Sequence, residues 1–311
     1  MMLRAVVCLL ALGLDGLLGE PRRGHPLVGF GRLADALEGR WNSPGQGSRL
    51  RGVVALLVLL IPVLIVALLA MLYLPLAILV AVDVLLLYLA LGLASLGTHA
   101  RAVTEPLSRG DLPEARLQVA RMVSRDTEQL DENGVAAAAT ESVLENGADA
   151  VFASLFWYLL AGLPGVLVHR LVNTLDAMWG YRNERFARFG WAAAHLDDLL
   201  GWIPARLTAL SYALVGQTGR GLRCWRRQGR LWSSPNAGPV MAAGAGALAL
   251  TLGGPAPYHG GWQDRPVLGE GATADAHSPD RAMTLLRRSV FLWLAIILSG
   301  AAAWYWSTVV A

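Results

Sequence analysis

Residues 53–96 read VVALLVLLIPVLIVALLAMLYLPLAILVAVDVLLLYLALGLASL, an apolar run that contains a single charged residue. A membrane-spanning helix needs about 20 apolar residues, so this run is long enough for two spans. Pro62 and Pro75 interrupt it, and we expect helices over about Val53–Leu72 and Leu76–Leu96. The run therefore indicates an all-α, multi-pass integral membrane protein.

Other apolar segments bring the expected total to about five to seven. Ser289–Ala311 has no charge and ends in aromatic residues suited to a membrane interface. Val151–Val168 contains the glycines and the proline of residues 162–165, which favours a broken, re-entrant segment over a full crossing. The weaker candidates are Leu199–Val215, Leu231–Gln263 and the N-terminal run Ala5–Leu14, which resembles a retained first helix more than a cleaved signal peptide.

The amino-acid composition excludes several kinds of catalytic and binding site. Charged residues make up 16% of the 311-residue chain, against about 25% in soluble domains. All 26 basic residues are arginine, which excludes a lysine Schiff base, a P-loop lysine and a lysine nucleophile. Two cysteines exclude a four-cysteine metal site, and a net charge of +3 without a basic arm gives no indication of nucleic acid binding. Arginine must therefore bind any anionic substrate.

Arginine-rich loops predict which side of the membrane is cytoplasmic. Residues 19–51 hold six arginines against three acidic residues, and residues 218–230 hold five arginines. The hairpin at 53–96 returns the chain to the same side. We therefore expect residues 97–150, which hold 10 of the 23 acidic residues, to form a cytoplasmic acidic helical segment within a single membrane-embedded domain of residues 1–311.

Three acidic residues recur at a helical spacing. At 100° per residue, Glu141, Glu145 and Asp149 fall within about 80° of one another on one helix face. Like charges at this spacing weaken a helix, so a bound cation such as Mg²⁺, or facing arginines, would stabilise the arrangement. A solvated acidic face is the alternative.

Further polar residues lie near the apolar segments. Ser124-Arg125-Asp126-Thr127 could hold a phosphate or a carboxylate through bidentate bonds, or could cap a helix. Asp197 and Asp198 precede Arg206, which lies in an apolar segment, where an arginine costs about 2.5–3.5 kcal/mol and needs a partner. We expect the two aspartates to be that partner, with a simple helix cap as their alternative role.

A turn with free N–H groups follows the second arginine-rich loop. Ser234-Pro235-Asn236 enters a Gly/Ala-rich run, and such a turn is able to bind an anion. Asp83 lies within the second predicted span, where an unpaired carboxylate is costly, so it must be protonated or paired with another group. We favour a structural pairing over a catalytic role for this residue.

In their order along the chain, these motifs resemble the CobD/CbiB family, the cobinamide-phosphate synthases of cobalamin biosynthesis. Glu20 is a departure, because the family usually has aspartate there. The motifs that carry the resemblance are Asp15–Pro21 with His25-Pro26, Ser124–Thr127, Glu141-Ser142 with Glu145-Asn146, Gly162–Gly165, Asn173–Asp176, Gly180–Asn183, Asp197–Arg206 and Ser234–Gly238.

The resemblance implies an ATP-dependent ligase that forms an amide bond. It would join the propionate carboxyl of (adenosyl)cobyric acid to the amine of aminopropanol phosphate, or of a related phosphorylated amino alcohol. The expected cofactors are ATP and Mg²⁺, and the corrinoid is a substrate. The expected location is the inner (cytoplasmic) membrane, with the active site facing the cytoplasm. The expected partners are these small molecules, the lipid bilayer and other late corrinoid-pathway membrane enzymes, and no nucleic acid.

Within this resemblance the motif residues take expected roles. Arg125, Arg182 and Arg206 would bind phosphate or the corrinoid carboxylate. The expected metal ligands are Glu141, Glu145 and Asp149. The expected catalytic residues are Glu141, Glu145, Asp176, Asp197 and Asp198, of which the three aspartates would bind metal or the substrate ammonium. The expected substrate-binding residues are Ser124, Arg125, Asp126, Thr127, Asn146, Asn173, Tyr181, Arg182, Asn183, Arg206, Ser234 and Asn236.

A non-catalytic relative of the same family is the alternative, either a membrane regulator or a corrinoid carrier. A carrier would more often show paired broken helices in two matching halves, and the sequence shows none. A regulator would be expected to lose the polar motifs, which are nearly all present.

Overall fold

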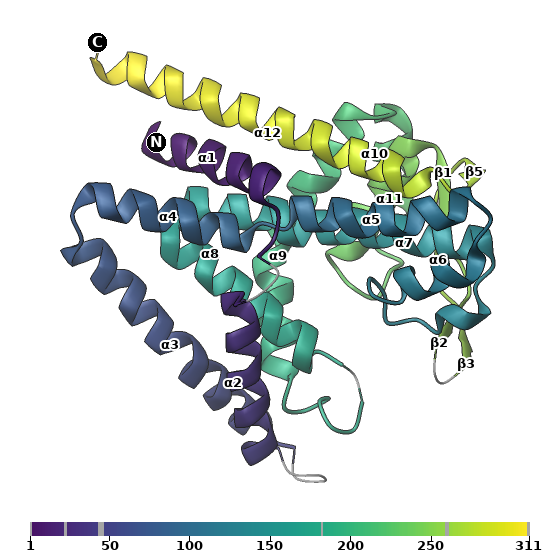
Figure 1. Ribbon diagram of the computed structural model, residues 1–311, viewed down its shortest axis with the longest axis horizontal. Coiled ribbons are helices and arrows are strands. Elements are labelled where there is room, and N and C mark those ends of the chain that lie inside the picture. The colour runs from purple at the N-terminus through teal and green to yellow at the C-terminus, as the bar shows by residue number, and fades with distance from the viewer. Residues whose placement is uncertain (1, 22–23, 43–46, 182, 259–260, 310–311) are drawn as a thin grey trace. The chain divides into compact units, whose positions relative to one another are not determined.

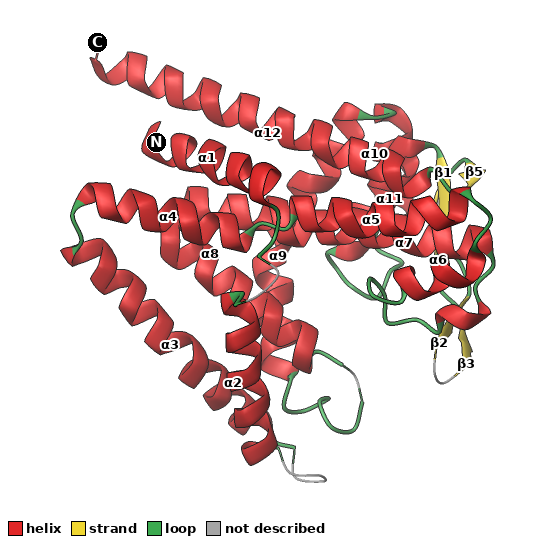
Figure 2. Cartoon of the chain, in the orientation of Figure 1, coloured by secondary structure: helices red, strands yellow, loops and turns green. Residues whose placement is uncertain are grey.

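The computed structural model describes residues 2–21, 24–42, 47–181, 183–258 and 261–309, and most of them are helical (Figures 1 and 2). The helices are α1 (Met2–Leu18), α2 (Pro26–Trp41), α3 (Arg49–Tyr73), α4 (Leu76–Ala90), α5 (Leu93–Ser108), α6 (Leu112–Val119), the 3₁₀-helix η1 (Thr127–Gln129), α7 (Glu132–Gly147), the π-helix η2 (Ala148–Ala153), α8 (Ser154–Trp179), α9 (Trp191–Val215), α10 (Thr218–Gln228), α11 (Ala237–Leu248) and α12 (Ser278–Val309).

Four helical stretches among the described residues are long and apolar enough to cross a membrane. They are Arg49–Tyr73, Leu76–Ser108, Glu132–Trp179 and Ser278–Thr308. The helices predicted over 53–72 and at the C-terminus are present, the one predicted over 76–96 is divided between α4 and α5 by a break after Ala90, and the N-terminal run is helical in α1. The total number of spans and the cytoplasmic side of residues 97–150 stay predictions.

The segment Leu231–Gln263, predicted as an apolar candidate span, does not form one. Its helix α11 has 12 residues, about 18 Å at 1.5 Å per residue, whereas the apolar core of a bilayer is about 30 Å thick. The helix ends where Ala249 takes a left-handed conformation with φ 56°, and Gly253 and Gly254 follow with φ 73° and 76°. The Gly/Ala-rich composition suited close packing and turns better than a span.

Short strands follow α11, so the all-α prediction was incomplete. They are β1 (Leu250–Gly253), β2 (Ala256–Tyr258), β3 (Gly261–Gln263), β4 (Val267–Gly269) and β5 (Ala272–Thr273), drawn yellow in Figure 2. β1 pairs antiparallel with β4 and parallel with β5, and β2 pairs antiparallel with β3.

The segment predicted to be broken is broken. The π-helix η2 leads into α8, and Gly162 within α8 has φ 66° and ψ −149°, which is far from helical geometry. Only glycine adopts this backbone conformation without strain. The break explains the glycine at this position, and re-entrance into the membrane stays a prediction.

The chain folds into two compact units. The first comprises Met1–Gly92, Ala153–Gly201 and Ala301–Ala311, and the second comprises Leu93–Phe152 and Trp202–Gly300. In the first unit α1 and α4 pack on each other and on α8, and α2 and α3 also contact α8. The Tyr158 hydroxyl donates to Asp83 Oδ2 at 2.6 Å, so the charged residue of the second predicted span is paired.

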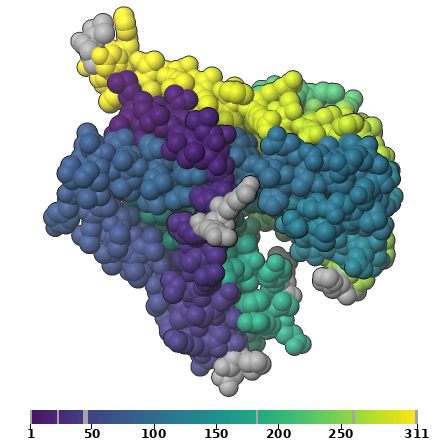
Figure 3. Space-filling model, viewed as in Figure 1, coloured from purple at the N-terminus to yellow at the C-terminus, as the bar shows by residue number. Residues whose placement is uncertain are grey.

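The second unit is built around α7. This helix is buried over most of its length and contacts α5, α6, α11 and β1. A Cβ on Gly244 of α11 would lie 2.6 Å from Leu144, so the small residues of α11 allow the two helices to approach closely. α5 and α6 contact each other and form a continuous surface of this unit in the space-filling view (Figure 3).

Candidate functional site

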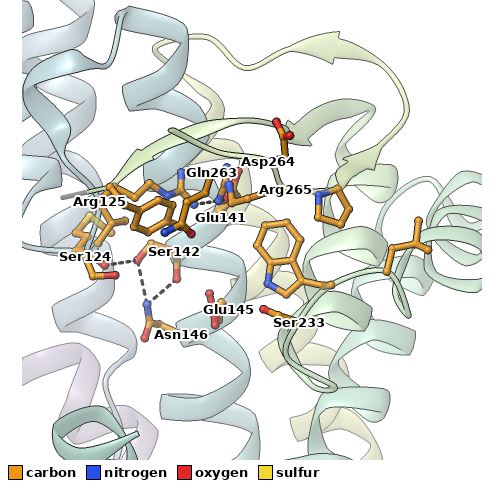
Figure 4. Close-up of a pocket in the computed structure, with 16 residues that line it drawn as sticks. Ser124, Arg125, Glu141, Ser142, Glu145, Asn146, Ser233, Gln263, Asp264 and Arg265 are labelled. Carbon is orange, nitrogen blue, oxygen red and sulfur yellow. Dashed lines mark hydrogen bonds and ion pairs between the residues drawn. The ribbon is translucent and has the colours of Figure 1, made fainter. Parts of the chain in front are cut away.

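A pocket of about 660 Å³ lies in the second unit, beside α7 (Figure 4). Its wall combines the loop before η1, one face of α7, the turn after α10 and the segment from β2 to β4. The lining residues are Met122, Val123, Ser124, Arg125, Glu141, Ser142, Glu145, Asn146, Leu231, Trp232, Ser233, Tyr258, Gln263, Asp264, Arg265 and Pro266.

The helix α7 positions four of these side chains. Asp131 caps its first turn by accepting a hydrogen bond from the Gly134 N–H at 2.7 Å. Residues one and four positions apart then bring Glu141, Ser142, Glu145 and Asn146 to the pocket. Ser142 donates to the Met122 carbonyl at 3.1 Å and Asn146 donates to Ser142 Oγ at 2.9 Å, which ties the helix to the loop before η1 (Figure 4).

Glu141 is the centre of the pocket's charged cluster. Its side chain is 2% exposed, and its carboxylate accepts hydrogen bonds from three segments of the chain. Oε1 accepts from the Gly253 N–H at 2.8 Å, and Oε2 accepts from Arg265 Nη1 at 3.1 Å and from Arg125 Nη2. Figure 4 shows the two arginines converging on this carboxylate. A buried carboxylate is stable here because its charge is matched and its lone pairs are used.

Each arginine has a second contact that holds its orientation. Arg265 Nε donates to the Gly254 carbonyl at 2.9 Å, and its guanidinium lies 5.2 Å from the centre of the Trp232 ring. Burial alone would lower the pKa of Arg125, but Glu141 and Tyr258 outweigh it and raise that pKa above its ordinary value. Both side chains are only 10% exposed, so the pocket contains two fixed, buried cations.

The predicted three-carboxylate metal site is not present. Glu141 and Glu145 line the pocket, whereas Asp149 does not. Asp149 lies in the π-helix η2, so the α-helical spacing extrapolated from Glu145 does not hold there. Among the residues that the structure describes, no group of three or more His, Cys, Asp or Glu side chains is placed to hold a metal. The sequence predicted that either a bound cation or facing arginines would stabilise this acidic helix face. At Glu141 the structure shows facing arginines.

The motif Ser124–Thr127 divides between two roles. Ser124 and Arg125 line the pocket. Asp126 does not, and instead caps η1 by accepting from the Glu128 N–H at 3.2 Å. Thr127 is buried in that helix. The capping alternative therefore describes Asp126, while Arg125 faces the pocket.

A second group of predicted residues gathers in the first unit, where α8 meets α9. Asn173 donates to Asp197 Oδ1 at 3.3 Å and accepts from Arg170 at 3.2 Å. Asp176 and Asp198 lie close enough for their charges to interact. None of these residues lines the pocket.

The adjoining loop holds the remaining predicted residues of this motif group. Tyr181 is 53% exposed, and Asn183 accepts from the Phe186 N–H at 2.9 Å within a turn. Arg182 lies outside the described residues.

A third predicted group lies in the second unit and is not part of the pocket lining. Arg206 donates to Asn236 Oδ1 at 2.8 Å and to the Trp202 carbonyl at 3.0 Å, with its guanidinium 4.5 Å from the centre of the Trp202 ring. Ser234 Oγ accepts from the N–H groups of Asn236 and Ala237 at 3.3 and 3.2 Å. The N–H groups predicted to bind an anion at the start of α11 are thus partly capped by Ser234.

Sequence reasoning missed the part of the wall that lies after α10. Trp232 and Tyr258 line the pocket but lie in Leu231–Gln263, which was interpreted as an apolar segment, and Asp264 and Arg265, directly after it, also line the pocket without having been predicted. The sequence Gly253-Gly254-Pro255, followed by a polar stretch ending at Arg265, was the available signal that the chain turns there.

Comparisons with known proteins give one consistent family. The model of the family described as CobD/Cbib protein matches residues 8–286. A relative from Stutzerimonas stutzeri, named cobalamin biosynthesis protein CobD, is 60% identical over 93% of this chain and 95% of its own length. Relatives with the same name from Chromobacterium violaceum and Rhodobacter capsulatus are 54% and 41% identical, over 94% and 97% of this chain and 95% and 98% of theirs.

No solved structure matched the chain. The family match covers most of the sequence, and the relatives are similar over nearly their whole length. The resemblance inferred from the order of the motifs is confirmed. This chain belongs to the CobD/CbiB protein family.

Proposed function

We propose that this protein is an adenosylcobinamide-phosphate synthase of cobalamin biosynthesis. It would use ATP to join the propionate carboxyl of (adenosyl)cobyric acid to the amine of aminopropanol phosphate or a related phosphorylated amino alcohol. Membership of the family and the name shared by its relatives, cobalamin biosynthesis protein CobD, support the pathway. The pocket beside α7 supports the type of chemistry.

The observation that carries the proposal is the pair of buried arginines on Glu141. Condensing a carboxylate with an ammonium in water is unfavourable, so the carboxylate must first be activated, here as an acyl phosphate. Phosphoryl transfer needs fixed positive charges around the phosphate more than it needs a protein nucleophile. Arg125 and Arg265 provide such charges, and in a chain without lysine arginine is the one residue type with a permanent positive charge.

The pocket does not fit a preformed magnesium site of three carboxylates, but it fits a metal that arrives with a nucleotide. Mg²⁺ is usually held by one or two carboxylates together with substrate phosphates. Glu145 lines the pocket one helical turn from Glu141 and near both arginines, so it would be the carboxylate that holds the metal. A bound Mg²⁺ would neutralise part of the phosphate charge.

We place the protein in the cytoplasmic membrane, with this pocket facing the cytoplasm. The four long apolar helices support a multi-pass protein, and the arginine-rich loops support the orientation. The bilayer and other late corrinoid-pathway membrane enzymes are its proposed partners, because a membrane location would bring enzymes of consecutive steps together.

The proposal is tested with the purified protein in detergent, supplied with cobyric acid, aminopropanol phosphate, ATP and Mg²⁺. We expect a corrinoid amide to form together with ADP and phosphate. If no amide forms with a folded protein, the synthase assignment is wrong. Tight corrinoid binding without ATP turnover would instead favour the regulator or carrier.

A further inference from the structure

The charged cluster in the pocket has more positive than negative charge. Two guanidinium groups share the single carboxylate of Glu141, and all three side chains are at most 10% exposed. A buried ion cluster is stable only when charge and hydrogen-bonding capacity are matched. The three hydrogen-bonded side chains therefore carry a net charge of +1.

The unused donors of the cluster indicate which kind of anion would match this charge. A guanidinium has five N–H donors in a planar fork. Arg265 uses Nε for the Gly254 carbonyl and Nη1 for Glu141, and among the described residues its Nη2 has no recorded bond. Ser124, Ser233 and Gln263 line the same pocket and can donate further hydrogen bonds. An anion with several acceptor oxygens, such as a phosphoryl group, matches this set of donors.

Glu141 is 2% exposed, and most of its hydrogen-bonding capacity is used within the protein. Its two oxygens accept three hydrogen bonds, from Gly253, Arg125 and Arg265. Its contribution is to hold two guanidinium groups side by side, although their positive charges repel each other. Glu141 is therefore a positioning residue.

The pocket also contains groups that attract a cation. Glu145 and Asp264 line it on opposite sides of the arginine pair (Figure 4), and Glu145 lies close enough to both arginines for their charges to interact. They would repel a bare phosphate, but they would attract one that brings a positive charge with it. Both phosphate-bearing substrates of the proposed reaction fit this requirement, because the amino alcohol phosphate carries its own ammonium and ATP carries Mg²⁺.

We infer that Arg125 and Arg265, held together by Glu141, form the subsite that binds the phosphoryl group of a substrate whose positive charge lies toward Glu145. This inference rests on the proposed function for the identity of the substrates. The new assignments are Arg265 as a phosphoryl-binding residue and Glu141 as the residue that positions it.

The experiment compares the wild type with Arg265→Gln and Arg265→Lys in two reactions. Amide formation, with aminopropanol phosphate varied, reports on the amino alcohol phosphate. Hydroxylamine in place of the amino alcohol traps the activated carboxyl as a hydroxamate, so varying ATP in that reaction reports on ATP alone. Arg223→Gln is the matched control, because Arg223 makes an exposed ion pair with Glu270 outside the pocket.

We expect Arg265→Gln to raise the KM for one of the two phosphate-bearing substrates by roughly 10- to 100-fold, the range of a lost charge-assisted hydrogen bond. Arg265→Lys should show a smaller increase, because it keeps the charge but loses the fork. A change in the KM for aminopropanol phosphate would show that the subsite binds the phosphoryl group of that substrate. A change in the KM for ATP in the hydroxylamine reaction would show that it binds a phosphoryl group of ATP. Unchanged KM values for both substrates, or a change only for cobyric acid, would overturn the inference.

A binding measurement separates the subsite from the reaction. Inorganic pyrophosphate titrated calorimetrically in the presence of Mg²⁺ should bind the wild type and Arg223→Gln equally, and Arg265→Lys and Arg265→Gln progressively more weakly. A protein that binds pyrophosphate in this way but makes neither amide nor hydroxamate refutes the synthase and leaves the subsite standing. An active synthase whose pyrophosphate affinity is the same in all variants refutes the subsite alone. Because Arg265→Lys keeps the charge balance with Glu141, it gives a result even if Arg265→Gln does not fold.

Discussion

Glu141 and Glu38 are two equally buried carboxylates in different surroundings. Each is 2% exposed and each is bound to arginine. Glu38 of α2 accepts two bonds from Arg185, at 3.0 and 2.6 Å, and one from Asn42 at 2.7 Å, while the Arg185 side chain is 63% exposed. Glu141 binds two arginines that are themselves buried and face a pocket. Burial of the carboxylate is therefore the same at both positions, and what sets Glu141 apart as a candidate site is that its cationic partners are shielded from solvent beside a cavity.

The largest effect is expected from Glu141→Gln, which removes the charge that holds two buried guanidinium groups together. Breaking a buried ion pair by removing one partner costs about 3–5 kcal/mol. We expect a loss of this size in the free energy of unfolding, together with a higher KM for the phosphate-bearing substrate. Thermal unfolding in detergent and steady-state kinetics measure the two effects. A variant with wild-type stability and KM would show that Glu141 positions neither arginine.

A smaller effect is expected from Glu38→Gln, the same substitution at the comparison site. Arg185 is exposed and regains water when its partner loses its charge, so the stability loss should be less than that of Glu141→Gln. The KM values for ATP and aminopropanol phosphate should stay at wild-type values, because Glu38 is outside the pocket lining. A KM change as large as that of Glu141→Gln would remove the distinction between the two sites.

The smallest effect is a dependence on pH. Burial would raise the pKa of Glu38, but the hydrogen bonds from Arg185 and Asn42 outweigh it and lower that pKa below its ordinary value of 4.5. A depressed folded-state pKa contributes stability above the ordinary value, and this contribution is lost as the pH falls through the lowered pKa. The difference in melting temperature between wild type and Glu38→Gln should therefore be constant from pH 7 to about 5 and shrink below about 4.5. A difference that widens in acid would contradict this sign.

Much of the fold could be predicted from the sequence because its signals are local. Long apolar runs predicted the helices α3, α4 and α12, and the Gly-Leu-Pro-Gly stretch predicted the break at Gly162. The Gly/Ala-rich run was misinterpreted, because small residues suit both a packed membrane helix and a short helix that ends in strands.

Only the α7 wall of the candidate pocket could be predicted from helical spacing in the sequence. Helical spacing brought Glu141 and Glu145 together, and both line the pocket, but it failed at Asp149, where the helix becomes a π-helix. Arg265 could not be found this way, since it is 124 residues from Glu141 and meets it only through the tertiary fold. Spacing describes one helix face, whereas the facing wall of a pocket depends on packing.

The sequence distance between Glu141 and its partners on the facing wall determines when the pocket can form during translation. The last two partners of Glu141, Gly253 and Arg265, follow it by 112 and 124 residues. At about 5–20 residues per second, a ribosome needs roughly 6–25 s to add the residues between Glu141 and Arg265. During that interval Arg125 is the one arginine of the cluster already present in the nascent chain. The pocket is therefore completed only when the strands after α11 have emerged, and a chain cut before them would contain three of its apolar helical stretches and an unfinished site.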